Sequence, residues 1–209
     1  MSEDKTFKYS GVNPCAEEPL PSGGSCLLGS INLSEFVIQP FSINATFDIN
    51  KFKSCVREAV VALNEVLDEG INLHPLEEQK ISVDKYRQIG LGVMGIADML
   101  LKLNLKYGSD ESINVCDFIA KNMLNEAVKQ SALLAKEKGA FKEYKEEDIF
   151  KSPFFINNVN EDIKELVKKY GLRNSQLLTI PPTGSISTML GISGGIEPIF
   201  NLSYIRKTE

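Results

Sequence analysis

Three side chains near the start of the chain could do chemistry together. Cys15 has the amide of Asn13 two residues before it and the carboxylate of Glu17 two residues after it. A thiol beside a base and a hydrogen-bonding amide suits nucleophilic or radical chemistry on a polar substrate. The spacing alone is equally compatible with a plain turn. Cys26 follows eleven residues after Cys15, on a return rich in glycine and serine.

A second candidate site lies near the other end of the chain, in the run Pro-Pro-Thr-Gly-Ser-Ile-Ser at 181–187. This run presents hydroxyl groups and unencumbered backbone N–H groups together. Such a combination can bind a phosphate group. A structural turn could use the same residues, so composition leaves both interpretations open.

The glycines at 90–95 fit the pattern G-x-G-x-x-G of dinucleotide-binding proteins. That pattern works when it follows an apolar strand and is followed about twenty residues later by an acidic residue at the end of a second strand. Here the polar run 84–88 precedes it, and the later position falls inside an expected helix. We expect these glycines to let the start of a helix pack closely against its neighbours. A dinucleotide-binding oxidoreductase is kept as the alternative enzyme, and a non-catalytic interaction domain as the alternative that is no enzyme.

Charge and hydropathy exclude several classes of protein. The 209 residues include 23 Lys and Arg against 28 Asp and Glu, a net charge of −5. Such a field does not attract nucleic acid or an anionic membrane surface. The start of the chain is polar and unlike a signal peptide, and the apolar stretch 89–101 is shorter than the roughly 20 residues of a membrane span. We expect a cytoplasmic protein that binds neither nucleic acid nor membrane.

The remaining cysteines and the single histidine suggest no further chemistry. Four cysteines are too few for a disulfide scaffold. Cys55 and Cys116 lie on the apolar stripes of expected helices, where we interpret them as buried structural thiols. His74 is far in sequence from any pair of cysteines, so no metal site is predicted.

Apolar periodicity and capping residues predict four helices outside short apolar strands, an α/β arrangement. The expected helices run from an N-cap at Asp48 to Gly70, over 96–103, from 109–112 to Gly139, and over 162–170. Short buried segments are expected at 26–37 and at 176–180, the second of which leads into 181–187. The region 140–160 is expected to be irregular.

Four blocks of residues together resemble one known family. They are Asn-Pro-Cys-x-Glu at 13–17, Ser-Cys and Leu-Gly-Ser-Ile-Asn-Leu within 25–33, Ile-Gly-Leu-Gly-Val-Met-Gly at 89–95, and Pro-Thr-Gly-Ser-Ile-Ser with Gly-Ile-Glu-Pro-Ile-Phe within 182–200. The chain resembles the catalytic subunit of ribonucleotide reductases, in particular the adenosylcobalamin-dependent class. The resemblance implies an α/β fold that is part of a ten-stranded α/β barrel, with outer helices and an inner cysteine-bearing loop.

The resemblance also implies a division of the chain and a set of roles. Residues 1–40 would form the radical-cysteine loop, 41–175 the helical outer layer, and 176–209 the phosphate-binding loop and a following strand. Cys15 would carry a thiyl radical that abstracts the 3′ hydrogen of the ribose, Glu17 would act as base on the 3′ hydroxyl, and Asn13 would bind the substrate hydroxyls. Cys26 would be one of the two cysteines that supply the electrons. The substrate phosphates would be held by Thr183, Gly184, Ser185 and Ile186.

The implied activity is that of a ribonucleoside-diphosphate reductase, which makes 2′-deoxyribonucleotides, although the choice between di- and triphosphate stays open. The implied cofactor is adenosylcobalamin, bound partly by segments outside this chain. Relatives that receive the radical from a separate metal-containing subunit share the cysteine loop, so the radical source also stays open. The resemblance further implies a thioredoxin-like reductant, nucleotide effectors and a homo-oligomer. The partner of Cys26 and the effector site are expected outside the chain, which should be inactive by itself. One departure is Ala16, which stands where many relatives have glycine.

Overall fold

Two parallel strands lie at the centre of the fold. The computed structural model describes residues 9–25, 27–201, 203 and 205. Within this part, β3 (Leu28–Asn32) pairs in parallel with β6 (Gly90–Met94), with Leu28 opposite Gly90. All five residues of β6 are buried. A parallel pair needs a crossover connection, and here the crossover contains α1 (Ile49–Gly70) and α2 (Glu77–Tyr86).

The segment 176–180, expected to be a buried strand, runs beside β6 in an extended conformation. Leu91 N–H donates to the carbonyl of Leu177 (2.8 Å), and Thr179 N–H donates to the carbonyl of Leu91 (3.1 Å). Only the Leu91–Leu178 pair forms a regular parallel bridge. The expected strand is therefore present as a third extended segment, although its pairing is too short to make a regular strand.

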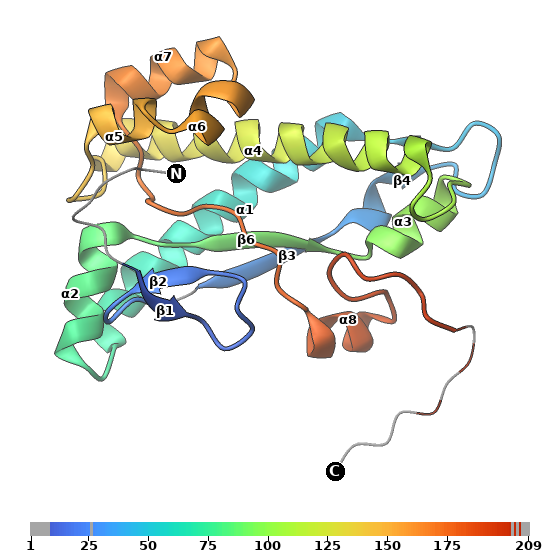
Figure 1. Cartoon of the computed structure of the whole chain (residues 1–209), viewed down its shortest axis with the longest axis horizontal. Helices are drawn as coiled ribbons and strands as arrows, with labels where there is room; N and C mark the ends of the chain where they lie inside the picture. Colours follow the sequence, from blue (N-terminus) through green and yellow to red (C-terminus); the bar gives the residue numbers. More distant parts are fainter. Residues whose placement is uncertain (1–8, 26, 202, 204, 206–209) are drawn as a thin grey trace.

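Two long helices cover one side of this sheet, as Figure 1 shows. They are α1 and α4 (Asp110–Lys138), and both begin where the sequence predicts. The Asp48 side chain caps α1 by accepting a hydrogen bond from Lys51 N–H (3.0 Å), and the Ser109 side chain caps α4 by accepting one from Ser112 N–H (3.3 Å). Their facing apolar side chains form much of the core. Fully buried examples are Phe52, Val56, Val60, Ala127, Val128 and Ala132.

The shorter helices confirm part of the sequence prediction and correct another part. Helices α3 (Ile96–Lys102) and α7 (Glu161–Tyr170) lie where they are expected. The prediction of an irregular region at 140–160 is wrong, because it contains α5 (Glu146–Phe150) and α6 (Pro153–Asn158). Ser152 caps α6 and Pro153 occupies its first turn, which is a recognisable start signal. None of the described helices is long and apolar enough to cross a membrane.

The first forty residues form more regular structure than a loop. Strands β1 (Tyr9–Val12) and β2 (Pro19–Pro21) pair as an antiparallel hairpin whose tip is the segment 13–18. In Figure 1 this hairpin and α8 (Gly184–Leu190) lie on the side of the β3–β6 pair that faces away from α4. The short elements η1 (Leu33–Phe36), β4 (Val37–Ile38), β5 (Thr46–Phe47) and η2 (Ile71–Leu73) complete the described part.

The glycine pattern at 90–95 is corrected by the structure. Gly90 and Gly92 lie inside β6 rather than at a turn after a strand, and only Gly95, with φ of +71°, stands at the start of a helix. A Cβ atom at Gly92 would come within 2.6 Å of the Thr179 carbonyl oxygen and of Pro181 Cδ. These glycines therefore let the segment 177–181 lie directly on β6. Because Gly90 and Gly92 lie inside the strand, the glycine-rich turn of a dinucleotide site is not formed between β6 and α3.

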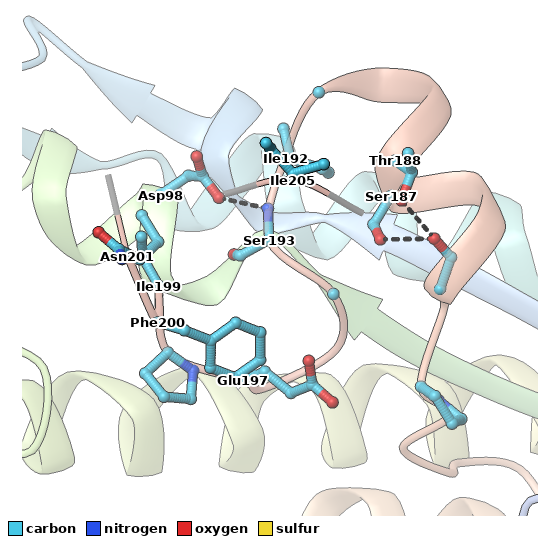
Figure 2. A pocket seen from close by; sticks show the side chains of 15 residues that line it. Asp98, Ser187, Thr188, Ile192, Ser193, Glu197, Ile199, Phe200, Asn201 and Ile205 are labelled. Carbon is cyan, nitrogen blue, oxygen red and sulfur yellow. Dashed lines mark hydrogen bonds between the residues drawn. The ribbon is translucent and has the colours of Figure 1, made fainter. Parts of the chain in front are cut away.

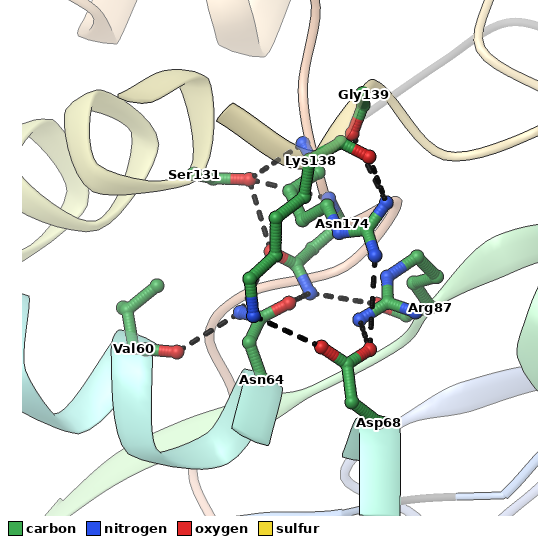
Figure 3. Close-up of polar contacts among 9 residues, drawn as sticks. Val60, Asn64, Asp68, Arg87, Ser131, Lys138, Gly139 and Asn174 are labelled. Atoms are coloured by element: carbon green, nitrogen blue, oxygen red, sulfur yellow. Dashed lines mark hydrogen bonds and ion pairs between the residues drawn. The ribbon is translucent and has the colours of Figure 1, made fainter. Parts of the chain in front are cut away.

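A buried polar network joins α1, α4 and the segment before residue 176 (Figure 3). Asn174 is fully buried, and its Nδ2 donates to Asn64 Oδ1 (3.0 Å) and to the Arg87 carbonyl (2.9 Å). Ser131 Oγ donates to Asn174 Oδ1 (3.0 Å). Every one of these buried groups is thus paired, which fixes the direction in which the chain enters 176–180.

Asp68 stands at the edge of the same network and pairs with three cations. Its carboxylate bonds Arg87, lies 3.2 Å from Lys138 Nζ and lies 3.7 Å from Arg173 Nη2. Burial works to raise the pKa of Asp68, but the hydrogen bonds and charges of Arg87 and Lys138 outweigh it and lower that pKa. The carboxylate therefore stays ionised and helps to hold Arg87, whose backbone is left-handed with φ of +49°.

Candidate active site

The tip of the first hairpin is closed by Asn13. Its Oδ1 accepts a hydrogen bond from Glu18 N–H (2.9 Å), and its backbone N–H donates to the Glu18 carbonyl (3.1 Å). Ala16 N–H donates to the Asn13 carbonyl (2.9 Å). Asn13 is buried, so its side-chain oxygen shapes the loop. Any bond from this side chain to a ligand would come from the amide N–H groups.

Cys15 and Glu17 lie on this loop in contrasting environments. Cys15 is exposed, whereas both carboxylate oxygens of Glu17 are buried and have no hydrogen-bond partner among the described residues. Burying a carboxylate without a donor is unfavourable. The arrangement suits a carboxylate that accepts a hydrogen bond from a ligand hydroxyl. Cys15, Glu17 and Asn13 thus share one short loop, and their catalytic roles stay predictions.

The fourth predicted catalytic residue, Cys26, lies outside the described residues. Its role stays a prediction. The two other thiols are half-buried on α1 and α4, and burial raises the pKa of both Cys55 and Cys116. A raised pKa keeps a thiol protonated and unreactive, in agreement with their interpretation as structural residues.

The hairpin is tied to the segment that leads into the second candidate site. Thr179 Oγ1 donates to the carbonyl of Glu17 (2.9 Å). Gln176 Nε2 donates to the carbonyl of Pro19 (2.9 Å). Neither residue is predicted from the sequence, because no local pattern marks a hydrogen bond between segments so far apart in the chain.

The predicted phosphate-binding residues form the start of α8 rather than an open loop. Thr183 is the N-cap, with φ of +55°, and its hydroxyl accepts a hydrogen bond from Gly195 N–H (2.8 Å). This buried hydroxyl therefore holds the protein's own backbone. Gly184, Ser185 and Ile186 are exposed and form the first turn, where backbone N–H groups have no partner within the helix. A Cβ atom at Gly184 would meet nothing within 4 Å.

A cavity of about 860 Å³ lies beside α8 and is bounded by the segment that follows it (Figure 2). Asp98 from α3 fixes one wall, because its Oδ2 accepts a hydrogen bond from Ser193 N–H (2.7 Å). Gly95 N–H donates to the Ser193 carbonyl (2.9 Å). Glu197 and Phe200 line the cavity further along. The strand expected after the phosphate loop is not formed within residues 191–201.

The described residues offer little to a metal ion. Within the described ranges, no three His, Cys, Asp or Glu side chains gather in a group that could hold one.

Comparison with known proteins gives the site its context. Residues 3–209 match the family described as "Ribonucleotide reductase, barrel domain". The vitamin B12-dependent ribonucleoside-diphosphate reductase of Thermoplasma acidophilum is 39% identical over 195 residues, which cover 93% of this chain and 22% of the relative. The corresponding Mycobacterium tuberculosis protein (strain H37Rv) is 31% identical over 199 residues, covering 95% of this chain and 25% of the relative.

A relative of another type and a solved structure agree with these matches. The ribonucleoside-diphosphate reductase subunit alpha of Chlamydia pneumoniae is 32% identical over 202 residues, covering 87% of this chain and 19% of the relative. The structure of the class Id ribonucleotide reductase alpha subunit of Actinobacillus ureae has a TM-score of 0.68 at 24% identity, covering 94% of this chain and 33% of that one. The chain spans about a fifth to a quarter of the length of these curated relatives. Its fold is part of an α/β barrel, and the chain belongs to the ribonucleotide reductase barrel-domain family.

Proposed function

We propose that the protein to which this chain belongs reduces ribonucleotides to 2′-deoxyribonucleotides by thiyl-radical chemistry. The observation that carries the proposal is the exposed thiol of Cys15 beside the buried, unpartnered carboxylate of Glu17, in a chain of this family. Neither alternative has comparable support. The glycines of the dinucleotide pattern are used inside β6, and an interaction domain would have no need of an unpaired buried carboxylate.

In the proposed reaction, a radical on the Cys15 sulfur removes the 3′ hydrogen of the ribose as the thiol reforms. Glu17 accepts the proton of the 3′ hydroxyl, and the amide N–H groups of Asn13 bind the substrate hydroxyls. The 2′ hydroxyl then leaves as water. Cys26 and a partner cysteine supply two electrons and are oxidised to a disulfide. The net change is one ribonucleotide and one dithiol converted into one deoxyribonucleotide, one disulfide and water.

The first turn of α8 is proposed to bind the substrate phosphates. Gly184, Ser185 and Ile186 are exposed residues whose backbone N–H groups suit phosphate oxygens, and the open space at Gly184 lets these oxygens approach closely. Thr183 would act by holding Gly195 rather than by touching phosphate. Accordingly, residues 1–40 would supply the radical and the base, 41–175 most of the supporting helices, and 176–209 the phosphate site. Because the relatives are named for diphosphates, we propose a ribonucleoside diphosphate as substrate.

Adenosylcobalamin is the proposed cofactor, since relatives from two organisms are named vitamin B12-dependent. When bound, it would supply the radical that reaches Cys15, and the exposure of this thiol fits such a supply. A separate radical-generating subunit is the second candidate, because another relative is named as an alpha subunit. We further propose a thioredoxin-like reductant, nucleotide effectors, a homo-oligomer and a cytoplasmic location, in line with the family.

The proposal is tested by the Glu17→Gln variant of the complete protein. The variant keeps the shape of the side chain but cannot accept the 3′ hydroxyl proton, so deoxynucleotide formation should fall by about 10²-fold or more. Glu111→Gln, an exposed position at the start of α4, is the matched control and should leave the rate unchanged. Full activity of the Glu17→Gln variant would contradict the role of Glu17 and with it the proposed mechanism.

A further inference from the structure

We propose that Thr179 is a positioning residue that holds the Cys15 loop in its reactive place relative to the start of α8. The inference rests on the proposed function. Its first support is the hydrogen bond from Thr179 Oγ1 to the Glu17 carbonyl (2.9 Å), which joins residues 162 positions apart. Thr179 is buried, with 8% of its surface exposed. The backbone of the proposed base is therefore fixed by one hydroxyl group from a distant segment.

Thr179 can fix another segment because it is itself fixed by β6. Its backbone N–H donates to the Leu91 carbonyl (3.1 Å). A Cβ atom at Gly90 would lie 2.8 Å from Thr179 Cγ2, and one at Gly92 would lie 2.6 Å from the Thr179 carbonyl oxygen. Residues two apart share one face of a strand. At the two glycines, this face of β6 therefore carries no side chains, and Thr179 packs directly on the backbone there.

The same segment continues directly into the proposed phosphate site. Pro181 lies between Thr179 and the N-cap of α8, and it packs on Gly92, where a Cβ atom would come within 2.6 Å of Pro181 Cδ. Two consecutive prolines fix their own φ angles and stiffen this connection. One short, stiff stretch of chain therefore fixes the positions of both α8 and the Glu17 backbone.

The consequence is geometric control of the reaction. Removal of a hydrogen atom and of a proton both require reacting atoms in near-attack positions, and a displacement of about 1 Å can cost 10²-fold in rate. The Cys15 loop is held within itself by the bonds of Asn13, which do not set its position relative to α8. That missing reference comes from the segment 176–180, whose Gln176 amide bonds Pro19 at the base of the hairpin and whose Thr179 hydroxyl bonds the loop itself at Glu17.

Two variants separate the hydroxyl from the rest of the side chain. Thr179→Val keeps the branched shape that packs on Gly90 but cannot donate to the Glu17 carbonyl. Thr179→Ser keeps the hydroxyl and loses only the methyl group. Thr46→Val, at an exposed position of β5, is the matched control for the chemical change.

The first measurement is hydrogen exchange at 13–18 in the complete protein, followed by mass spectrometry. Thr179→Val should increase exchange there by about tenfold or more, because loss of the anchoring bond lets the loop open. Thr179→Ser and Thr46→Val should exchange like the parent. An unchanged exchange rate in a folded Thr179→Val protein would overturn the inference, and this readout needs no catalytic activity.

The second measurement is steady-state reduction of a ribonucleoside diphosphate. Thr179→Val should lower kcat about tenfold or more with KM changed less than about threefold, and Thr179→Ser should restore kcat. A loose loop with unchanged kcat would overturn the positioning role. If the parent protein itself reduces no ribonucleotide, the proposed function fails, while the exchange measurement still decides whether Thr179 anchors the loop.

Discussion

Single residues shape the Cys15 loop through contacts within the protein. The family resemblance implies that Asn13 binds the substrate hydroxyls, and the structure shows that its side-chain oxygen also closes the loop. Ala16 adopts a left-handed conformation with φ of +63°. Such a conformation costs a residue with a Cβ atom about 1–2 kcal/mol. Alanine in place of glycine at this position therefore lowers the stability of the folded chain.

Ala16→Gly should stabilise the chain. Removing the left-handed strain outweighs the greater freedom of glycine in the unfolded state, for a net gain of about 0.5–1 kcal/mol in the free energy of unfolding. Urea denaturation measures it as a higher midpoint at an unchanged slope. Ala59→Gly, in the middle of α1, should instead destabilise by about 1 kcal/mol. A loss of stability in both variants would show that Ala16 is not strained.

Gly184→Val tests the phosphate site at the same scale. The new side chain would project into open space next to the first turn of α8, so the fold should be unaffected while phosphate oxygens are kept away. We expect the dissociation constant for a ribonucleoside diphosphate to rise about tenfold or more, equivalent to about 1.4 kcal/mol. Gly70→Val, at the end of α1 and also facing open space, should bind normally. Equal affinity of the parent protein, Gly184→Val and Gly70→Val for the nucleotide would mean that 183–187 is only a structural turn.

The sequence predicts those helices whose start and length are set by local signals. The N-caps Asp48 and Ser109 and the apolar stripes behind them are local signals, and α1 and α4 follow them. The segment 176–180 and β6 are different, because their pairing depends on partners far away in the chain. For that reason the sequence predicts that the glycines of β6 serve the start of a helix, since only the structure shows Thr179 and Pro181 lying against them.

Asn174→Ala tests the network that directs the chain into 176–180. The change leaves the side chains of Asn64 and Ser131 and the carbonyl of Arg87 without their partner in a buried place. An unpaired buried polar group costs about 1–3 kcal/mol, so we expect a loss of at least about 2 kcal/mol in the free energy of unfolding. Asn122→Ala removes only an exposed bond to Phe118 in α4 and should cost less than about 0.5 kcal/mol. Thermal or urea denaturation measures the free energy of unfolding of both variants. Equal small losses of stability would contradict a structural role for the network.

At the scale of the whole molecule, the chain spans about a fifth to a quarter of its curated relatives. An apolar groove of about 490 Å³ runs between β3 and α1, lined by side chains such as Ile31, Phe36 and Leu63. In a barrel, such a groove would be covered by a neighbouring strand and helix. The four motif blocks are enough to identify the family. They could not predict the groove or the anchor at Thr179, because both depend on how distant elements pack.

We expect the 209-residue chain by itself to associate and to be inactive. The apolar groove and unpaired strand edges favour association, which light scattering measures as a mass above that of one chain. No deoxynucleotide should form with adenosylcobalamin and dithiothreitol, because the partner of Cys26 is expected elsewhere. A monomeric chain that reduces ribonucleotides would contradict this expectation.

Cys15 is proposed to carry the radical and Cys26 the reducing electrons, and label exchange separates these two roles. In the complete protein, exchange of hydrogen label from the 5′ position of adenosylcobalamin is followed in Cys15→Ser and Cys26→Ser, with Cys116→Ser as the control. Exchange should be lost in Cys15→Ser, because a serine O–H bond is too strong to replace the thiol. It should persist in Cys26→Ser, although multiple turnover stops. Exchange or substantial turnover in a folded Cys15→Ser protein would contradict the radical role of Cys15, and an equal loss of exchange in both variants would contradict the division of roles.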